Sequence, residues 1–250
     1  MRFTVELLRH PAGSSESFWQ EINYKTEDEM ETVERMLTRI NMLSEQGLKD
    51  TSGNDVGYIF WECNCLQKKC GACAMVINGY PSLACDTRIK KFEKRGRITV
   101  EPLRKFPVVA DFIVDRSILF ENLKTMRVWY ENAVDIPGEK ARDAYESSRC
   151  MQCGLCLEVC PNFAPGDDFF GAAAFVPTSR LITTLEEKDR EELAKSYVKH
   201  IYSGCGKSLA CAKICPAGIR IDRLLSSSNL ISVWKRGRRG LRRAKKTDEE

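Results

Sequence analysis

Twelve cysteines in a chain of 250 residues constrain this sequence more than any other feature. They fall into three groups, at residues 63–85, 150–160 and 205–215. So many thiols indicate disulfides, zinc or iron–sulfur clusters. Disulfide frameworks belong to secreted chains, usually small ones, whereas residues 1–6 lack the apolar stretch of a signal peptide. We therefore expect reduced thiols that bind metal.

The remaining composition excludes several classes of site and partner. A net charge of +4 is too mild to indicate nucleic-acid binding. The two histidines, His10 and His200, lie far apart, which disfavours a histidine-rich zinc or non-haem iron site. No apolar run approaches the ~20 residues that span a bilayer. We expect a soluble chain in a reducing compartment.

The hydropathy pattern before residue 105 mixes strand and helix. Residues 3–7 alternate apolar and polar, which predicts a half-buried strand, and residues 18–24 suggest a second one. Apolar residues at helical spacing predict an amphipathic helix over about 31–46. Residues 74–77 and 80–84 flank Asn78-Gly79 and predict a hairpin, with 98–100 as a closing strand. Residues 1–105 thus describe a small α+β domain.

The pattern after Pro107 is helical. One helix face is predicted from the spacing of Val109, Phe112, Ile113, Arg116, Leu119, Phe120 and Leu123. Further helices are predicted over 178–202 and 221–234, so residues 106–235 are expected to form an all-helical domain. The basic tail, 236–250, is either a solvated terminus or a segment attracted to an anionic membrane face.

The first cysteine group has the plant-type [2Fe–2S] spacing. Three ligands follow the pattern Cys65-x4-Cys70-x2-Cys73, and Cys85 supplies the fourth from a later segment. Structural zinc sites usually pair two close cysteine knuckles, whereas Cys85 stands alone. Cys63 is surplus, and we interpret it as a buried or free thiol rather than a ligand.

The second group has the bacterial ferredoxin spacing. Its pattern is Cys150-x2-Cys153-x2-Cys156-x3-Cys160-Pro161. In ferredoxins with two clusters, the fourth cysteine of such a run ligates the other cluster. A second run that ends in Cys-Pro is therefore expected further along the chain.

The third group is similar to that run with one ligand missing. Its pattern is Cys205-x5-Cys211-x3-Cys215-Pro216, and Ser208 stands where the middle cysteine would be. Two zinc knuckles would not account for two successive Cys-Pro endings.

The exchange of ligands between the two runs predicts two different clusters. One cluster takes four thiolates and should be [4Fe–4S], with ligands Cys150, Cys153, Cys156 and Cys215. The other takes three thiolates, which favours [3Fe–4S], with ligands Cys160, Cys205 and Cys211. The Ser208 oxygen or a water could instead hold a fourth iron, and this alternative stays open.

A plant-type ferredoxin domain followed by a helical one with a missing ligand resembles the iron–sulfur subunits of succinate dehydrogenase and fumarate reductase. The resemblance covers residues 1–235. It is carried by residues 64–73, by the hairpin that leads to Cys85 and by both Cys-Pro runs. Residues 107–115 also look like the stretch that joins the two domains in that family.

The resemblance implies an electron-transfer subunit of a succinate:quinone oxidoreductase. A β-grasp ferredoxin domain would face a flavoprotein subunit with FAD, and an α-helical ferredoxin domain would face a membrane anchor where quinone binds. Dicarboxylate catalysis would occur in the flavoprotein, so no catalytic residue is expected here. The chain would lie peripherally at the cytoplasmic face of the bacterial inner membrane. Direction of catalysis, haem in the anchor and oligomeric state are not implied.

Two departures from ubiquinone-linked members bear on the quinone. Those members have a tryptophan after the first Cys-Pro, whereas Cys160-Pro161-Asn162-Phe163 leads here into Ala164 and Pro165 with no tryptophan. They also have a histidine where this chain has Gly206. Residues 150–162 instead look like menaquinone-linked subunits of Gram-positive bacteria. Menaquinone is the expected acceptor, and no quinone ligand can be named.

Two other functions compete with this one. The chain could be the iron–sulfur subunit of a soluble, thiol-linked fumarate reductase, although those usually carry extra cysteine-rich modules. It could also be a free-standing ferredoxin carrier or a zinc-stapled binding module. No dinucleotide-binding fingerprint is present in the sequence.

Overall fold

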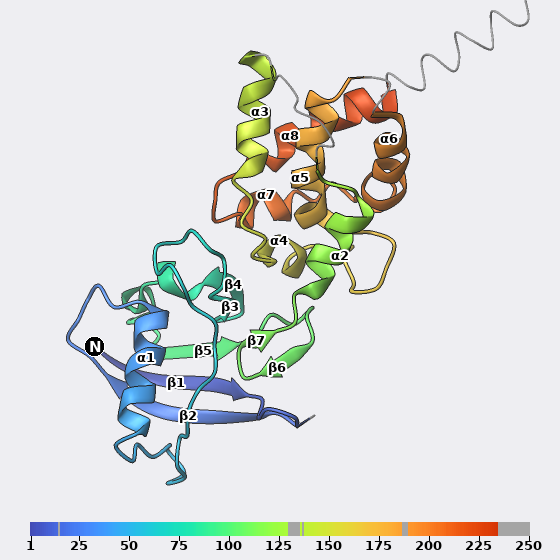
Figure 1. Cartoon of the computed structure of the whole chain (residues 1–250). Coiled ribbons are helices and arrows are strands. Elements are labelled where there is room, and N and C mark those ends of the chain that lie inside the picture. Colours follow the sequence, from blue (N-terminus) through green and yellow to red (C-terminus); the bar gives the residue numbers. More distant parts are fainter. Residues whose placement is uncertain (15, 130–135, 137, 187–189, 235–250) are drawn as a thin grey trace, which may run out of the picture. The chain divides into compact units, whose positions relative to one another are not determined.

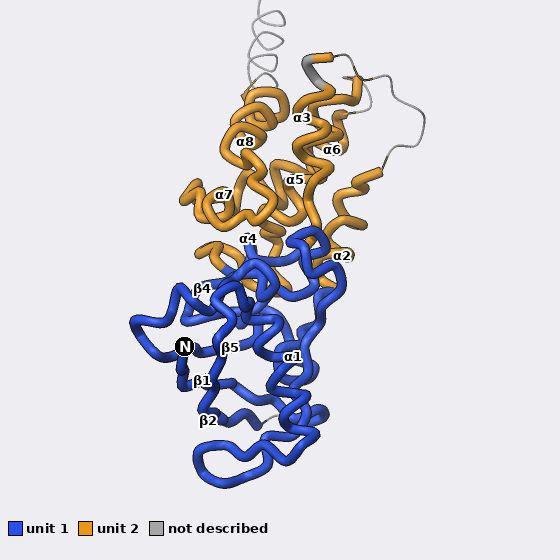
Figure 2. Tube along the Cα trace, turned by 90° about the vertical axis from the view of Figure 1, so that its left-hand side faces the viewer, with its two compact units in different colours: residues 1–116, 153–158 blue, residues 117–152, 159–250 orange. Residues whose placement is uncertain are grey.

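The computed structural model, drawn in Figure 1, describes residues 1–14, 16–129, 136, 138–186 and 190–234. The predicted basic tail lies outside these ranges. The chain forms two compact units, coloured separately in Figure 2. The first unit is Met1–Arg116 with Cys153–Glu158, and the second is Ser117–Gln152 with Val159–Glu250. The domain boundary expected near residue 105 remains a prediction.

The first unit is built on a five-stranded sheet of order β2-β1-β5-β3-β4 (Figure 1). Its strands are β1 (Arg2–Arg9), β2 (Phe18–Lys25), β3 (Ala74–Ile77), β4 (Tyr80–Leu83) and β5 (Arg97–Glu101). β1 pairs antiparallel with β2 and parallel with β5. Alternate residues of β1, namely Phe3, Val5 and Leu7, are buried, which confirms the predicted half-buried strand.

The predicted hairpin and helix are also present. Asn78 and Gly79 both have positive φ, +49° and +76°, as the tight turn between β3 and β4 requires. Helix α1 (Val33–Ser44) begins at the N-cap Thr32, whose side chain accepts a hydrogen bond from the Arg35 N–H. Four of its apolar side chains are completely buried and form part of this unit's core: Val33, Met36, Leu37 and Ile40.

The helix predicted after Pro107 was placed too near the N-terminus. Residues 108–114 form a two-stranded hairpin, β6 (Val108–Ala110) and β7 (Ile113–Val114), and helix α2 covers only Ser117–Thr125. Asp111 reverses the chain with a left-handed φ of +41°. Its buried carboxylate accepts hydrogen bonds from Arg9 and from the backbone N–H groups of His10 and Phe60. These contacts with distant segments override the local helical pattern.

The described residues of the second unit contain helices and no strand. Besides α2, its elements are α3 (Gly138–Ser148), α5 (Gly171–Thr184), α6 (Glu191–Tyr197), π-helical η4 (Val198–Tyr202), α7 (Ala210–Ile214), α8 (Ile221–Asn229) and π-helical η5 (Leu230–Trp234). The short helix α4 (Leu155–Glu158) belongs to the first unit. The prediction of one helix over 178–202 was wrong, because this range contains the end of α5, then α6 and η4. The helix predicted over 221–234 is confirmed by α8 and η5. Across the described ranges, no helix is long and apolar enough to cross a membrane.

Candidate functional site: three groups of cysteines

The β3–β4 hairpin brings Cys73 and Cys85 of the first cysteine group together. Cys73 immediately precedes β3, and Cys85 lies in the 3₁₀ turn η1 (Ala84–Asp86) that follows β4. The register pairs Ala74 with Leu83, and the Ala84 N–H donates to the Cys73 carbonyl at 3.0 Å. The antiparallel pairing therefore places two thiols side by side although they are distant in sequence.

The loop that carries Cys65 directs backbone N–H groups at its sulfur. Leu66 and Lys68 have left-handed φ values of +53° and +60°. This conformation lets the N–H groups of Gln67 and Lys69 donate to Cys65 Sγ at 3.4 and 3.2 Å. These hydrogen bonds lower the pKa of Cys65 to about 7. The thiolate, which is the metal-binding form of cysteine, is thereby favoured.

Cys73 lies in a different environment from Cys65. Burial, together with the nearby Cys85 and Cys70, raises the pKa of Cys73 to about 12. Four thiolates so close would repel one another, and a bound cation offsets that repulsion. Four cysteines with backbone donors aimed at sulfur form a donor set that fits a [2Fe–2S] cluster.

The surplus Cys63 is exposed. Partial burial of its sulfur and the charge of Glu34 raise its pKa, and Cys70 and Cys85 add to the effect. Its thiolate is therefore disfavoured, in contrast with that of Cys65. That Cys63 is not a ligand remains a prediction.

Arg116 holds both ends of the cysteine loop, residues 62–72, in place. Its guanidinium donates to the Glu62 carboxylate at 2.6 Å and to the Ala72 carbonyl at 3.0 Å. A salt bridge of 2.8 Å also joins Lys68 to Asp86, the neighbour of Cys85. Sequence reasoning placed Arg116 on a helix face and missed this role. An arginine within an otherwise apolar face was the signal that could have revealed it.

Of the predicted [4Fe–4S] ligands, Cys150 and Cys215 belong to the second unit, and Cys153 and Cys156 belong to the first. Burial raises the pKa of Cys150, hydrogen bonds from Gln152 oppose this, and the nearby charge of Cys215 raises it further. Two of the predicted [4Fe–4S] ligands therefore lie close together, and the full set remains a prediction.

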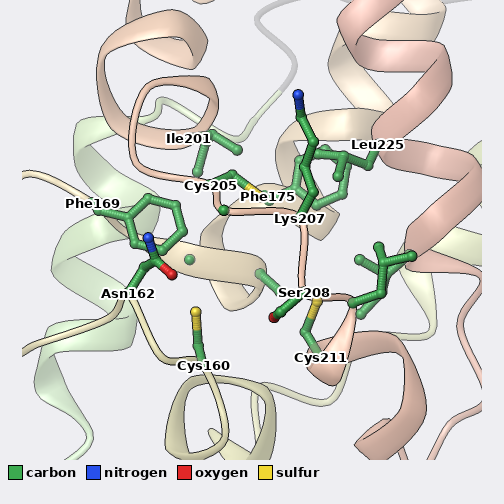
Figure 3. Close-up of a pocket in the computed structure, with 15 residues that line it drawn as sticks. Cys160, Asn162, Phe169, Phe175, Ile201, Cys205, Lys207, Ser208, Cys211 and Leu225 are labelled. Carbon is green, nitrogen blue, oxygen red and sulfur yellow. The ribbon is translucent and has the colours of Figure 1, made fainter.

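The three predicted [3Fe–4S] ligands line one cavity within the second unit, shown in Figure 3. Cys160, Cys205 and Cys211 share it with Ser208, and in Figure 3 the Ser208 side chain lies between those of Cys160 and Cys211. Its walls are largely apolar: Phe169, Ala172, Phe175, Ile201, Leu209, Ile221 and Leu225.

The chemistry of this cavity fits a cluster with three thiolate ligands. Burial, together with the charges of Cys160 and Cys205, raises the pKa of Cys211 to about 11. A thiol that is this costly to ionise needs a nearby cation to become a thiolate. The three cysteines are half-buried, and burial is one of the factors that set a cluster's reduction potential.

None of these groups has the arrangement of a single-ion site. Within the described ranges, no three histidine, cysteine, aspartate or glutamate side chains are arranged to hold one metal ion. Tetrahedral zinc binds sulfur at about 2.3 Å, which draws its ligands tightly round one centre. A cluster shares its thiolates among several irons and takes a wider cage.

We expect a Gly204→Ala substitution to deform the [3Fe–4S] cavity. A Cβ atom at Gly204 would lie 2.5 Å from the ring of Phe169, a wall residue, and 2.7 Å from its Cβ. Overpacking of this kind lowers the free energy of unfolding by about 1–3 kcal/mol. Thermal or urea unfolding measures it. Gly138→Ala is the matched control, because a Cβ atom at Gly138 would meet nothing within 4 Å; equal losses in both variants would contradict the prediction.

Comparison with known proteins gives matches over both units. A family model for a 2Fe-2S iron–sulfur cluster binding domain matches residues 4–121, and one for a 4Fe-4S dicluster domain matches residues 146–219. The chain is 36% identical over 204 residues to the succinate dehydrogenase iron–sulfur subunit of Bacillus subtilis, covering 78% of each chain. It is 30% identical over 190 residues to the fumarate reductase iron–sulfur subunit of Wolinella succinogenes, covering 70% of this chain and 77% of that one.

A solved structure has a similar fold. One chain of the Mycobacterium smegmatis Sdh1 complex in the apo form superposes with a TM-score of 0.71 at 23% identity, covering 91% of this chain and 95% of that one.

Proposed function

This chain belongs to the family of iron–sulfur subunits of succinate dehydrogenase and fumarate reductase, and on that premise we propose that it passes electrons between the FAD of a flavoprotein subunit and a quinone at a membrane anchor. The observation that carries the proposal is the gathering of Cys160, Cys205 and Cys211 with Ser208 in one cavity. A three-thiolate site after a plant-type group is the pattern on which the resemblance to this family rests. Bound clusters would act as one-electron carriers, and the residues of this chain would hold them in place.

We assign eleven of the twelve cysteines to the clusters. The [2Fe–2S] ligands are Cys65, Cys70, Cys73 and Cys85. The [4Fe–4S] ligands are Cys150, Cys153, Cys156 and Cys215. The [3Fe–4S] ligands are Cys160, Cys205 and Cys211. Residues 1–105 would be a β-grasp ferredoxin domain and residues 106–235 an α-helical ferredoxin domain.

The surrounding residues have distinct roles in this proposal. Backbone N–H groups in the Cys65 loop stabilise negative sulfur, and Arg116 holds the ends of that loop in place. The largely apolar walls of the third site would pack against the cluster. Succinate oxidation and fumarate reduction would use these residues equally, because neither dicarboxylate nor flavin would bind to this chain.

We further propose that the acceptor is menaquinone and that the chain lies peripherally at the cytoplasmic face of the bacterial inner membrane. Support for menaquinone comes from residues 162–165, which lack the tryptophan of ubiquinone-linked relatives, and from Gly206, which stands where those relatives have a histidine. Asn162 and Gly206 both line the cavity of the third site, and a Cβ at Gly206 would lie 3.1 Å from the Asn162 side-chain oxygen.

The proposal is tested on the complex purified from native membranes. We expect flavin to co-purify with this chain, and succinate to reduce its clusters as followed by electron paramagnetic resonance. A complex without flavin, whose clusters exchange no electrons with succinate or fumarate, would refute the function while leaving cluster binding intact.

A Cys65→Ala substitution should abolish the [2Fe–2S] signal and spare the other two. The three remaining ligands belong to the first unit, whereas the [3Fe–4S] ligands belong to the second. Spectra of the dithionite-reduced complex measure this, and succinate should no longer reduce the other clusters. Cys63→Ala is the matched control and should keep all three signals. Loss of the [2Fe–2S] signal in the control instead of in Cys65→Ala would show that the ligand assignment is wrong.

A further inference from the structure

The Gln152 side chain contacts both a predicted cluster ligand and a helix that contains a proline. Its side-chain Nε2 lies 3.1 Å from Cys150 Sγ and 3.0 Å from the carbonyl oxygen of Ala173 in α5. Both neighbours are acceptors when Cys150 is a thiolate, so the amide must turn its NH₂ group toward them. One NH₂ group thus supplies a donor to each, and the second contact fixes the direction of the first.

The Ala173 carbonyl is available because α5 contains a proline. Pro177 lies inside the helix and has no N–H to donate to the residue four positions before it, which is Ala173. Ala173 is buried, so its carbonyl needs another donor. The Gln152 amide is that donor, and Pro177 thereby creates the anchor point for Gln152.

Three locally unfavourable features meet at this point. Gln152 has a left-handed φ of +52°, which a residue with a Cβ rarely adopts. Its Oε1 is buried and has no hydrogen-bond partner among the described residues. A proline in the interior of α5 is the third. Local features that oppose stability and converge on one contact indicate that the contact serves function.

We propose that Gln152 is a positioning residue that donates a hydrogen bond to the thiolate of Cys150 and raises the reduction potential of the [4Fe–4S] centre. The inference deepens the proposed function, since it takes Cys150 as a cluster ligand. Hydrogen bonds to ligating sulfurs are among the factors that set cluster potentials. Reduction adds negative charge, which a donated N–H stabilises, so removal of the donor should lower the potential.

The test is a redox titration of the intact complex with a Gln152→Met substitution, followed by the [4Fe–4S] resonance. Methionine keeps the length of the side chain and removes the donor. We expect the equilibrium constant for one-electron reduction to fall about tenfold, which is a shift of about 59 mV. The potentials of the other two clusters, read in the same sample, should not move. Gln46→Met, at an exposed glutamine after α1, is the matched control and should shift nothing.

A second variant keeps the proposal testable if Gln152→Met fails to assemble the cluster. Pro177→Ala restores the helical N–H partner of Ala173 and competes with Gln152 for that carbonyl, so the potential should fall in the same direction.

The outcomes separate this inference from the function on which it rests. An assembled cluster with an unchanged potential in Gln152→Met would overturn the role of Gln152 and leave the proposed function standing. If Gln152→Met does not assemble, an unchanged potential in Pro177→Ala has the same consequence. Absence of any [4Fe–4S] signal from the wild-type complex would overturn the proposed function as well.

Discussion

Replacing Arg9 with methionine is expected to lower the free energy of unfolding of the chain by about 3–5 kcal/mol, because it leaves the buried Asp111 carboxylate without its partner. Arg9 lies at the end of β1, and its side chain and that of Asp111 are 9% and 2% exposed. The guanidinium donates to Asp111 at 2.9 Å, to Gln20 at 2.6 Å and to the carbonyls of Val56 and Tyr58.

The ion pair holds together segments that are far apart in the chain. Asp111 in the turn between β6 and β7 also accepts from the N–H groups of His10 and Phe60. Residues 56–60 lead directly into the cysteine loop. We therefore expect Arg9→Met to destabilise residues 56–60, which precede the [2Fe–2S] ligands, as well as the β6–β7 hairpin.

Urea denaturation of the purified subunit measures the effect, with Lys49→Met as the matched control. Lys49 pairs with Asp55 at 2.6 Å, but both side chains are mostly exposed, so its loss should cost less than about 1 kcal/mol. The double variant Arg9→Met/Asp111→Leu should lose less than the sum of the single variants, because it leaves no unpaired charge. An Arg9→Met variant as stable as the Lys49→Met control would contradict this account.

A Ser208→Cys substitution is expected to convert the third site from three irons to four. Ser208 shares the cavity with Cys160, Cys205 and Cys211 and occupies the position of the missing ligand. A thiolate there completes a Cys₄ set, which is the usual ligand set of [4Fe–4S] clusters. The near-isotropic resonance of the oxidised sample should disappear, and a new resonance should appear on reduction.

The control for this conversion is Ser208→Ala. It removes the hydroxyl without adding a ligand, and it should keep the three-iron resonance. A Ser208→Cys protein that still shows the three-iron resonance would mean that residue 208 does not face the cluster. Loss of the resonance in Ser208→Ala alone would mean that the serine hydroxyl helps to assemble the site.

Local signals in the sequence predicted those parts of the fold in which neighbouring residues determine structure. The alternation in β1, the Asn78-Gly79 turn and the amphipathic face of α1 are all present. The hairpin at 108–114 was wrongly predicted as helix because its turn depends on contacts between Asp111 and Arg9, about a hundred residues away. No pattern within 108–114 carries that information.

One helix boundary was misplaced. The helix was predicted to begin at residue 178, directly after Pro177, whereas α5 begins at Gly171. The proline instead lies in the interior of α5. Helix α3 was not predicted at all: it contains mostly polar residues, and no apolar stripe marks it in the sequence.

The candidate cluster ligands could be predicted from cysteine spacing alone, but spacing did not identify the residues that support them. Cluster ligands recur at fixed intervals because each loop must wrap a rigid core. Arg116 and Gln152 act instead through carbonyls of distant segments, at Ala72 and Ala173. Such contacts depend on tertiary structure and have no fixed spacing in the sequence.

The central claim is that this chain holds three different clusters. Electron paramagnetic resonance of the wild-type complex, recorded as oxidised and after reduction with dithionite, tests it most directly. We predict a near-isotropic three-iron resonance in the oxidised sample, and separate [2Fe–2S] and [4Fe–4S] resonances in the reduced one. A sample that contains zinc and shows no iron-dependent resonance in either state would contradict the account.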